Sequence, residues 1–155
     1  DALAAADLAH ADTYRANAAR YLDELKALDN SIVQQVGSIP RERRKLVTNH
    51  DTFGYFAARY GFDVVGAVIP SLSPEAQPSA QDIARLVETV RQTGVGAVFA
   101  ENTVSPRLAE QIARDSGAQV VGTLYTDSLG ESGSAGDSYS KMMRYDVDEI
   151  VKALR

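Results

Sequence analysis

The chain has 155 residues, of which 45% are hydrophobic, and a formal net charge of −5. This length suits one domain with a sizeable core, and the acidic balance argues against a nucleic-acid partner, because phosphate binding depends on clustered Lys and Arg. The absence of cysteine excludes disulfides, thiolate metal sites and cysteine nucleophiles. One short basic cluster encloses Glu42 and is typical of a solvated turn; it contains Arg41, Arg43, Arg44 and Lys45.

The first predicted element is a long helix over residues 11–36. No glycine or proline interrupts it, and it should end near Gly37, with Pro40 beyond as a stop. At 1.5 Å per residue it would run about 40 Å, which is more than a small core requires. The helix therefore either braces two lobes or docks on this domain's own sheet. Its apolar stripe recurs at spacings of four and three, at Tyr14, Ala18, Tyr21, Leu25, Leu28 and Ile32.

Beyond this helix, short valine-rich runs alternate with helical segments. The runs predict strands covered on both faces, at residues 45–48, 64–68, 97–100 and 120–125. Helices are expected over 52–60, over 79–92 with Ser79 as N-cap and Asp82 in the first turn, between Ser105 and Gly117, and over 138–154. Alternating strands and helices predict an α/β fold, with a four-stranded parallel sheet covered by helices and preceded by the long helix.

Two predicted loops, 69–78 and 127–137, are longer than the crossovers need, and long loops often carry function. Open parallel sheets bind ligands beyond the carboxyl ends of their strands. Three strands are followed there by polar residues: Asn49, His50 and Asp51; Glu101 and Asn102; Thr126, Asp127 and Ser128. An imidazole with carboxylates suits zinc or manganese. Polar residues in these positions also serve as helix caps, as expected for Asp51, so the pattern alone leaves both interpretations open.

Other chemistries have less support, and no enzymatic activity is expected. No strand is followed by a GxGxxG or GxxxxGK[ST] phosphate loop, and there is no GxSxG elbow. Nothing marks Ser105 or Ser128 as an activated nucleophile beside His50. Glu101 and Asp127 could act as paired carboxylates on a sugar, but few aromatic residues accompany them. The remaining histidine, His10, is expected on the surface.

Several longer strings resemble one family. LVTNHDTFGYFAARYGF, over residues 46–62, is similar to the "VT-H-AF-YF---YG" segment of the cluster A-I solute-binding receptors of manganese and zinc ABC transporters. YRANAARYLDELKALD resembles the linking helix of those receptors. AVFAENTVSPRLAEQIA resembles their third strand and the helix after it, and LYTDSLGESGSAGDSYSKMMRYDVDEIVKAL resembles their carboxyl terminus. The resemblance covers essentially the whole chain.

The resemblance implies two α/β lobes joined by a long helix, with one metal ion between them held by two residues from each lobe. Residues 1–37 would then be the linking helix, and 38–155 the carboxyl-terminal lobe. His50 and Asp127 match the family's two ligands in this lobe, and Glu101 matches an acidic residue that orients His50, lines the cleft or serves structure. A nitrogen ligand favours zinc, while the carboxylate keeps manganese open.

The function implied is metal capture outside the cytoplasmic membrane and delivery to an ABC permease, in a periplasmic or lipid-anchored parent protein. The chain begins within a helix-like stretch, so an amino-terminal lobe is expected to be missing. Two ligands alone should bind zinc or manganese weakly or not at all, and the exposed lobe face should favour self-association. Asp127 starts a Gly/Ser-rich loop and is the ligand expected to move. The alternative is an isolated lobe that acts as an interaction domain without metal.

Overall fold

The computed structural model describes residues 1–69, 78–103 and 105–155, so most of the predicted loop 69–78 lies outside the described residues. In chain order the helices and strands are α1 (Ala2–Ala6), α2 (Ala11–Gly37), β1 (Lys45–His50), α3 (Gly54–Tyr60), β2 (Asp63–Ile69), α4 (Ala80–Thr93), β3 (Ala97–Glu101), α5 (Arg107–Ser116), β4 (Gln119–Leu124) and α6 (Tyr139–Leu154). Short 3-10 turns occupy Leu8–His10 and Arg41–Arg43. The predicted α/β class, with its long leading helix, is confirmed.

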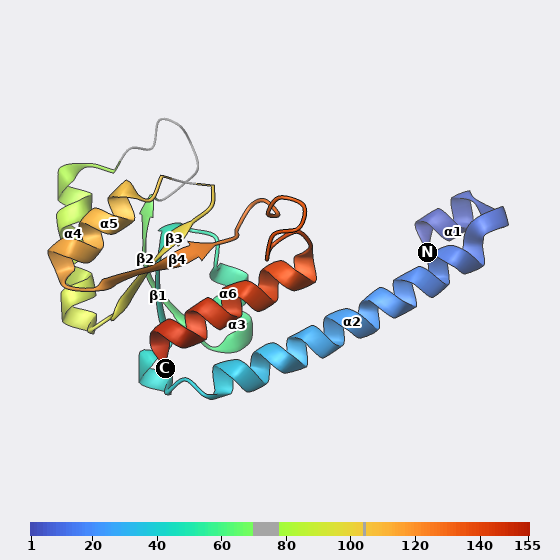
Figure 1. Cartoon of the computed structure of the whole chain (residues 1–155), viewed down its shortest axis with the longest axis horizontal. Helices are drawn as coiled ribbons and strands as arrows, with labels where there is room; N and C mark the ends of the chain where they lie inside the picture. Colours follow the sequence, from blue (N-terminus) through green and yellow to red (C-terminus); the bar gives the residue numbers. More distant parts are fainter. Residues whose placement is uncertain (70–77, 104) are drawn as a thin grey trace.

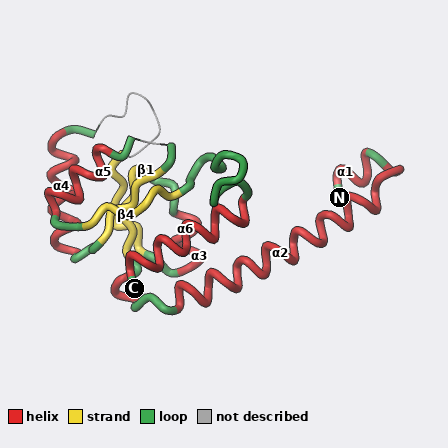
Figure 2. The backbone as a smooth tube through the Cα atoms, in the orientation of Figure 1, coloured by secondary structure: helices red, strands yellow, loops and turns green. Residues whose placement is uncertain are grey.

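The four strands form one parallel sheet in the order β2-β1-β3-β4. The chain first winds outward from β1 to β2, then crosses back over β1 to reach β3 and β4 (Figure 2). The winding direction therefore reverses between β1 and β3. In open α/β sheets, the carboxyl ends of the strands at such a switch point form the usual ligand crevice.

Helices cover both faces of this sheet (Figure 1). Neighbouring residues of a strand point to opposite faces, so Leu46 joins the core beneath α2, α3 and α6, while Val47 joins the core beneath α4 and α5. Phe99 and Val98 divide between the two cores in the same way, and all four side chains are fully buried. The expectation of coverage on both faces is wrong for β4. It is an edge strand with exposed positions, including Val120.

The long helix α2 packs on this lobe only through its carboxyl-terminal part. Leu28, Ile32 and Val36 are buried against α3 and α6, whereas Tyr21 is 46% exposed. The amino-terminal half of α2 runs away from the lobe and carries α1 at its far end (Figure 1). The predicted apolar stripe is therefore only partly used by the described lobe, where α2 packs on α6 and α3 and shares a core with Leu46 and Phe99 of the sheet.

An ion pair fixes the docked part of α2. Arg59 donates through Nε to Asp29 Oδ1 at 3.1 Å and also contacts the other carboxylate oxygen, and the Tyr60 hydroxyl donates to Asp29 at 3.0 Å. These hydrogen bonds from Arg59 and Tyr60 lower the pKa of Asp29. Burial and the Asp29 carboxylate together raise the pKa of Tyr60 to about 12. These polar contacts join α2 to the end of α3 beside the buried face of α2.

Two helix starts differ from the prediction. Asp51 does not cap α3, which begins at Gly54 with Phe53 at the cap position. The Phe53 ring is buried in the core, so the chain bends once more before the helix begins. α5 begins at Arg107, one residue after Pro106, the predicted first helical position; Pro106 itself already has helical backbone angles. The reciprocal cap of α4, from Ser79 and Asp82, is confirmed.

The docked and open faces of α2 should differ in how much their side chains contribute to stability. Ile32→Ala removes a side chain that is 2% exposed and should lower the free energy of unfolding by about 2–4 kcal/mol. Val33→Ala, at a neighbouring position that is 50% exposed, should change it by less than about 0.5 kcal/mol. Urea unfolding of both variants measures the difference, and equal losses would contradict this docking.

Candidate metal centre

Sheet topology brings one imidazole and two carboxylate side chains to the switch point. Thr48 of β1 lies opposite Phe99 of β3, so His50 and Glu101, two residues further along, meet at the carboxyl ends of these strands. Asp127 follows β4, which pairs with the other side of β3. The three residues that sequence reasoning selected therefore come together, although they lie on three different strand ends.

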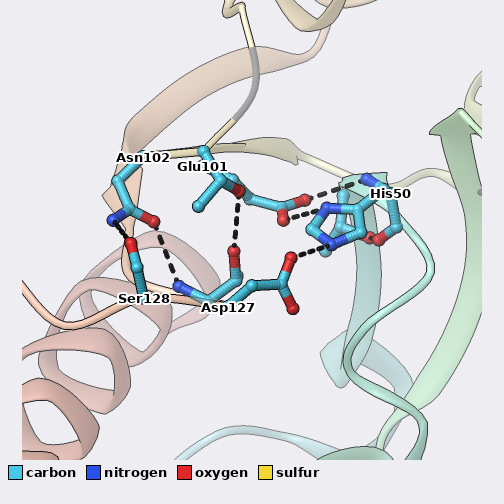
Figure 3. Close-up of polar contacts among 8 residues, drawn as sticks. His50, Glu101, Asn102, Asp127 and Ser128 are labelled. Atoms are coloured by element: carbon cyan, nitrogen blue, oxygen red, sulfur yellow. Dashed lines mark hydrogen bonds and ion pairs between the residues drawn. The ribbon is translucent and has the colours of Figure 1, made fainter. Parts of the chain in front are cut away.

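His50 lies between two carboxylates (Figure 3). Its backbone N donates to Glu101 Oε1 at 2.9 Å, its Nδ1 directly contacts Glu101 Oε2, and its Nε2 lies 2.8 Å from Asp127 Oδ2. The Glu101 side chain is 0% exposed and that of His50 is 4% exposed, but that of Asp127 is 42% exposed. The site therefore has a buried, fixed side and an open side.

The contacts of His50 determine what its ring can do. Thr48 is fully buried and its Oγ1 donates to the His50 carbonyl at 2.8 Å, which holds the end of the strand. A carboxylate at Nδ1 keeps a proton on that nitrogen. Nε2 faces the open side, where it forms a hydrogen bond with Asp127 Oδ2; once that proton is lost, its electron pair is free to bind a cation. Together they form a mixed nitrogen and oxygen donor pair suited to a borderline or hard divalent cation.

Glu101 faces Nδ1 rather than the space between Nε2 and the Asp127 carboxylate (Figure 3). Within the described parts of the chain, no group of three or more His, Cys, Asp and Glu side chains could hold a metal ion together. His50 Nε2 and Asp127 Oδ2 are thus two donor atoms that lie side by side at this edge of the sheet.

Asp146 is a buried carboxyl that sequence reasoning missed. It is 4% exposed, and its Oδ1 accepts a hydrogen bond from Tyr125 N at 2.9 Å, just before Asp127. Burial, with a smaller contribution from the charge of Glu101, raises the pKa of Asp146 to about 7. A sequence signal existed: Asp146 lies four residues from both Met142 and Ile150, so it falls on the buried stripe of α6.

The loop after Asp127 is packed against an aromatic ring. A Cβ added at Gly136 would lie 2.7 Å from atoms of the Tyr125 ring, and one at Gly130 would lie 2.8 Å from it, so only glycine permits this approach. Gly130 N also donates to the Gly136 carbonyl at 2.8 Å, which closes the loop. The glycines that suggested mobility in the sequence thus allow close packing.

The other candidates do not join this centre. His10 is exposed and contacts Asp7, with Tyr14 on the same carboxylate. Ser128 accepts a hydrogen bond from Asn102, while both ring nitrogens of His50 face carboxylates. A triad of Ser128, His50 and Asp127 is therefore not formed.

The lobe thus combines a parallel sheet covered by helices, a long projecting helix and an imidazole–carboxylate pair at the switch point. The family model described as "Zinc-uptake complex component A periplasmic" (ZnuA) matches residues 1–153. The chain belongs to this family, which is a transport family and not a family of enzymes.

Individual relatives of the chain are named for metal binding. The chain is 38% identical over 144 residues to the manganese-binding lipoprotein MntA of Halalkalibacterium halodurans, covering 93% of this chain and 47% of the relative. It is 38% identical over 152 residues to the iron-binding protein YfeA of Yersinia pestis, covering 97% and 48%. The periplasmic zinc-binding protein TroA of Treponema pallidum superimposes with a TM-score of 0.89 at 31% identity, and the match covers 99% of this chain and 56% of TroA.

The chain thus spans about half the length of the curated relatives it matches. In the part of the chain that the structure describes, no helix combines the length and apolar character needed to cross a membrane.

Replacing Asp146 by asparagine should reveal the cost of its buried charge. Its raised pKa means that the folded state holds this proton more tightly than the unfolded chain, so the carboxyl lowers stability increasingly as pH rises from about 4 to about 7. Asp146→Asn keeps an acceptor for Tyr125 N and should stabilise the fold by about 1–3 kcal/mol at pH 8. Thermal unfolding should show that this gain fades below about pH 5; a gain independent of pH would refute the assignment.

Proposed function

We propose that this chain is the carboxyl-terminal lobe of an extracytoplasmic receptor that captures a divalent metal ion, zinc or manganese, and delivers it to an ABC permease. His50 Nε2 and Asp127 Oδ2 are its two ligands from this lobe. The observation that carries the proposal is their 2.8 Å contact at the switch point between β1 and β3, with Glu101 behind the ring. Relatives named for manganese, iron and zinc binding support the same cargo class.

The geometry suits exchange of a proton for a metal ion. Zinc bonds to nitrogen and oxygen of about 2.1 Å, arranged tetrahedrally, place neighbouring donor atoms about 3.4 Å apart. The present separation of 2.8 Å is that of a hydrogen bond, so the two side chains must part slightly as the ion enters. Asp127 is exposed and can move outward, whereas His50 is held by Glu101 and Thr48.

The rest of the coordination sphere is assigned to an amino-terminal lobe in the parent protein. The relatives are about twice as long as this chain. The amino-terminal part also exposes large apolar side chains for which a second lobe would provide cover: Leu3, Leu8, Tyr21 and Leu22. With two protein ligands, residues 1–155 alone should bind metal only weakly, since stable zinc sites use more protein ligands.

Capture and release then need no covalent chemistry. Metal binding requires an unprotonated Nε2 and an ionised Asp127, so uptake displaces a proton from the pair. Release requires one ligand to leave, and Asp127 faces solvent while His50 does not. Relatives named as lipoproteins support membrane anchoring of the parent outside the cytoplasm, where a permease can accept the ion.

Substitution of the two ligands tests the proposal in the receptor that carries this lobe. His50→Ala and Asp127→Ala should each weaken zinc and manganese binding by more than about 100-fold, since even residues behind the ligands are worth 10–100-fold. His10→Ala is the matched control, because the His10 ring is exposed and contacts Asp7 rather than either member of the pair. Isothermal titration calorimetry measures the affinities.

Unchanged affinity in the double variant would remove the metal-binding proposal. Equilibrium dialysis of residues 1–155 alone should detect little bound metal at micromolar concentration. Tight binding by this piece would contradict the division of ligands between two lobes.

A further inference from the structure

One amide side chain spans Asp127. Thr126 N donates to Asn102 Oδ1 at 3.2 Å, and Asn102 Nδ2 donates to Ser128 Oγ at 3.0 Å. Asn102 therefore contacts the residue on each side of Asp127 (Figure 3). Its own backbone N donates to the Leu124 carbonyl at 2.9 Å, which ties the amide to the ends of β3 and β4.

The position of the Asp127 carboxylate depends on this support. The side chain is 42% exposed, and its Oδ2 reaches across to His50 Nε2. An exposed carboxylate loses rotamer and backbone freedom when it is held in one place, and that loss weakens binding unless the freedom has already been removed. Fixing Thr126 and Ser128 removes much of it before any ion arrives.

The carboxyl end of β3 also holds His50, the other proposed ligand. Glu101 contacts the backbone N and Nδ1 of His50, while its neighbour Asn102 spans Asp127. β3 lies between β1 and β4 in the sheet, so one central strand end sets the separation of donors that come from the strands on either side.

We propose that Asn102 is a positioning residue for metal capture, which holds the Asp127 carboxylate toward His50 Nε2. This inference rests on the proposed function. An amide fits the task because it offers an acceptor for Thr126 N and a donor for Ser128 Oγ on one short planar group. A carboxylate could accept but not donate. A contact of 3.2 Å between the hydroxyls of Thr103 and Thr126 adds to the same support.

The test compares metal affinity and stability in the whole receptor, by calorimetry with zinc or manganese alone as the probe. Asn102→Ala should weaken binding by about 10-fold, the lower end for residues that orient ligands. Asn102→Asp and Ser128→Ala, which each spare the bond to Thr126 N, should lose less. Gln92→Ala, a matched exposed amide on α4, should leave the affinity unchanged.

A double-variant cycle separates positioning from general damage to the fold. If Asn102 acts through Asp127, adding Asn102→Ala to Asp127→Ala should weaken binding no further. In the metal-free protein, Asn102→Ala should also speed hydrogen exchange at the Thr126 amide, while the melting temperature stays near that of the parent.

The possible failures are distinct. Unchanged affinity in Asn102→Ala, with affinity lost in His50→Ala, would overturn the positioning inference alone. An equal loss in the Asp127→Ala background would also overturn it, because the effect would then bypass Asp127. Unchanged affinity in His50→Ala would instead overturn the proposed function itself.

Discussion

The contact between His50 and Glu101 is the constraint from which the rest of the centre follows. Glu101 is fully buried, and a buried carboxylate that loses its partner costs about 3–5 kcal/mol. Because Glu101 contacts both the backbone N and the ring of His50, the same pairing joins β1 to β3 and sets the direction of the imidazole. The pair of His50 and Glu101 thus both stabilises the sheet and orients the imidazole ring.

Much of this arrangement could be predicted from local sequence. Valine-rich runs located the strands within a few residues. The rule that parallel sheets bind at their carboxyl ends gave a set of polar residues that includes His50, Glu101 and Asp127, and the family resemblance singled out these three. Strand order could not be predicted from the runs alone. It is the order β2-β1-β3-β4 that makes β1 and β3 neighbours and allows His50 to meet Glu101.

Other features of the site depend on residues that are close only in the folded chain, and the sequence indicates them weakly. The glycines after Asp127 suggest a mobile loop when read in sequence, whereas Gly130 and Gly136 make room for the Tyr125 ring. Asp146 interrupts the apolar stripe of α6, which is a visible signal, but its partner Tyr125 N lies on a distant segment. Asn102 was recognised as a polar residue at a strand end. Its contacts with Thr126 and Ser128 could not be inferred without the fold.

The centre is therefore asymmetric, and the asymmetry suits a receptor that must both hold and release an ion. His50 is buried and fixed by groups shielded from water, so its ring cannot easily turn away. Asp127 is exposed and supported by hydrogen bonds at the surface, each of which water can replace at low cost. A ligand held in this way is preorganised for capture but can be withdrawn by a small rearrangement. Under the proposed function, Asp127 is therefore the donor that can leave without disturbing the strand ends.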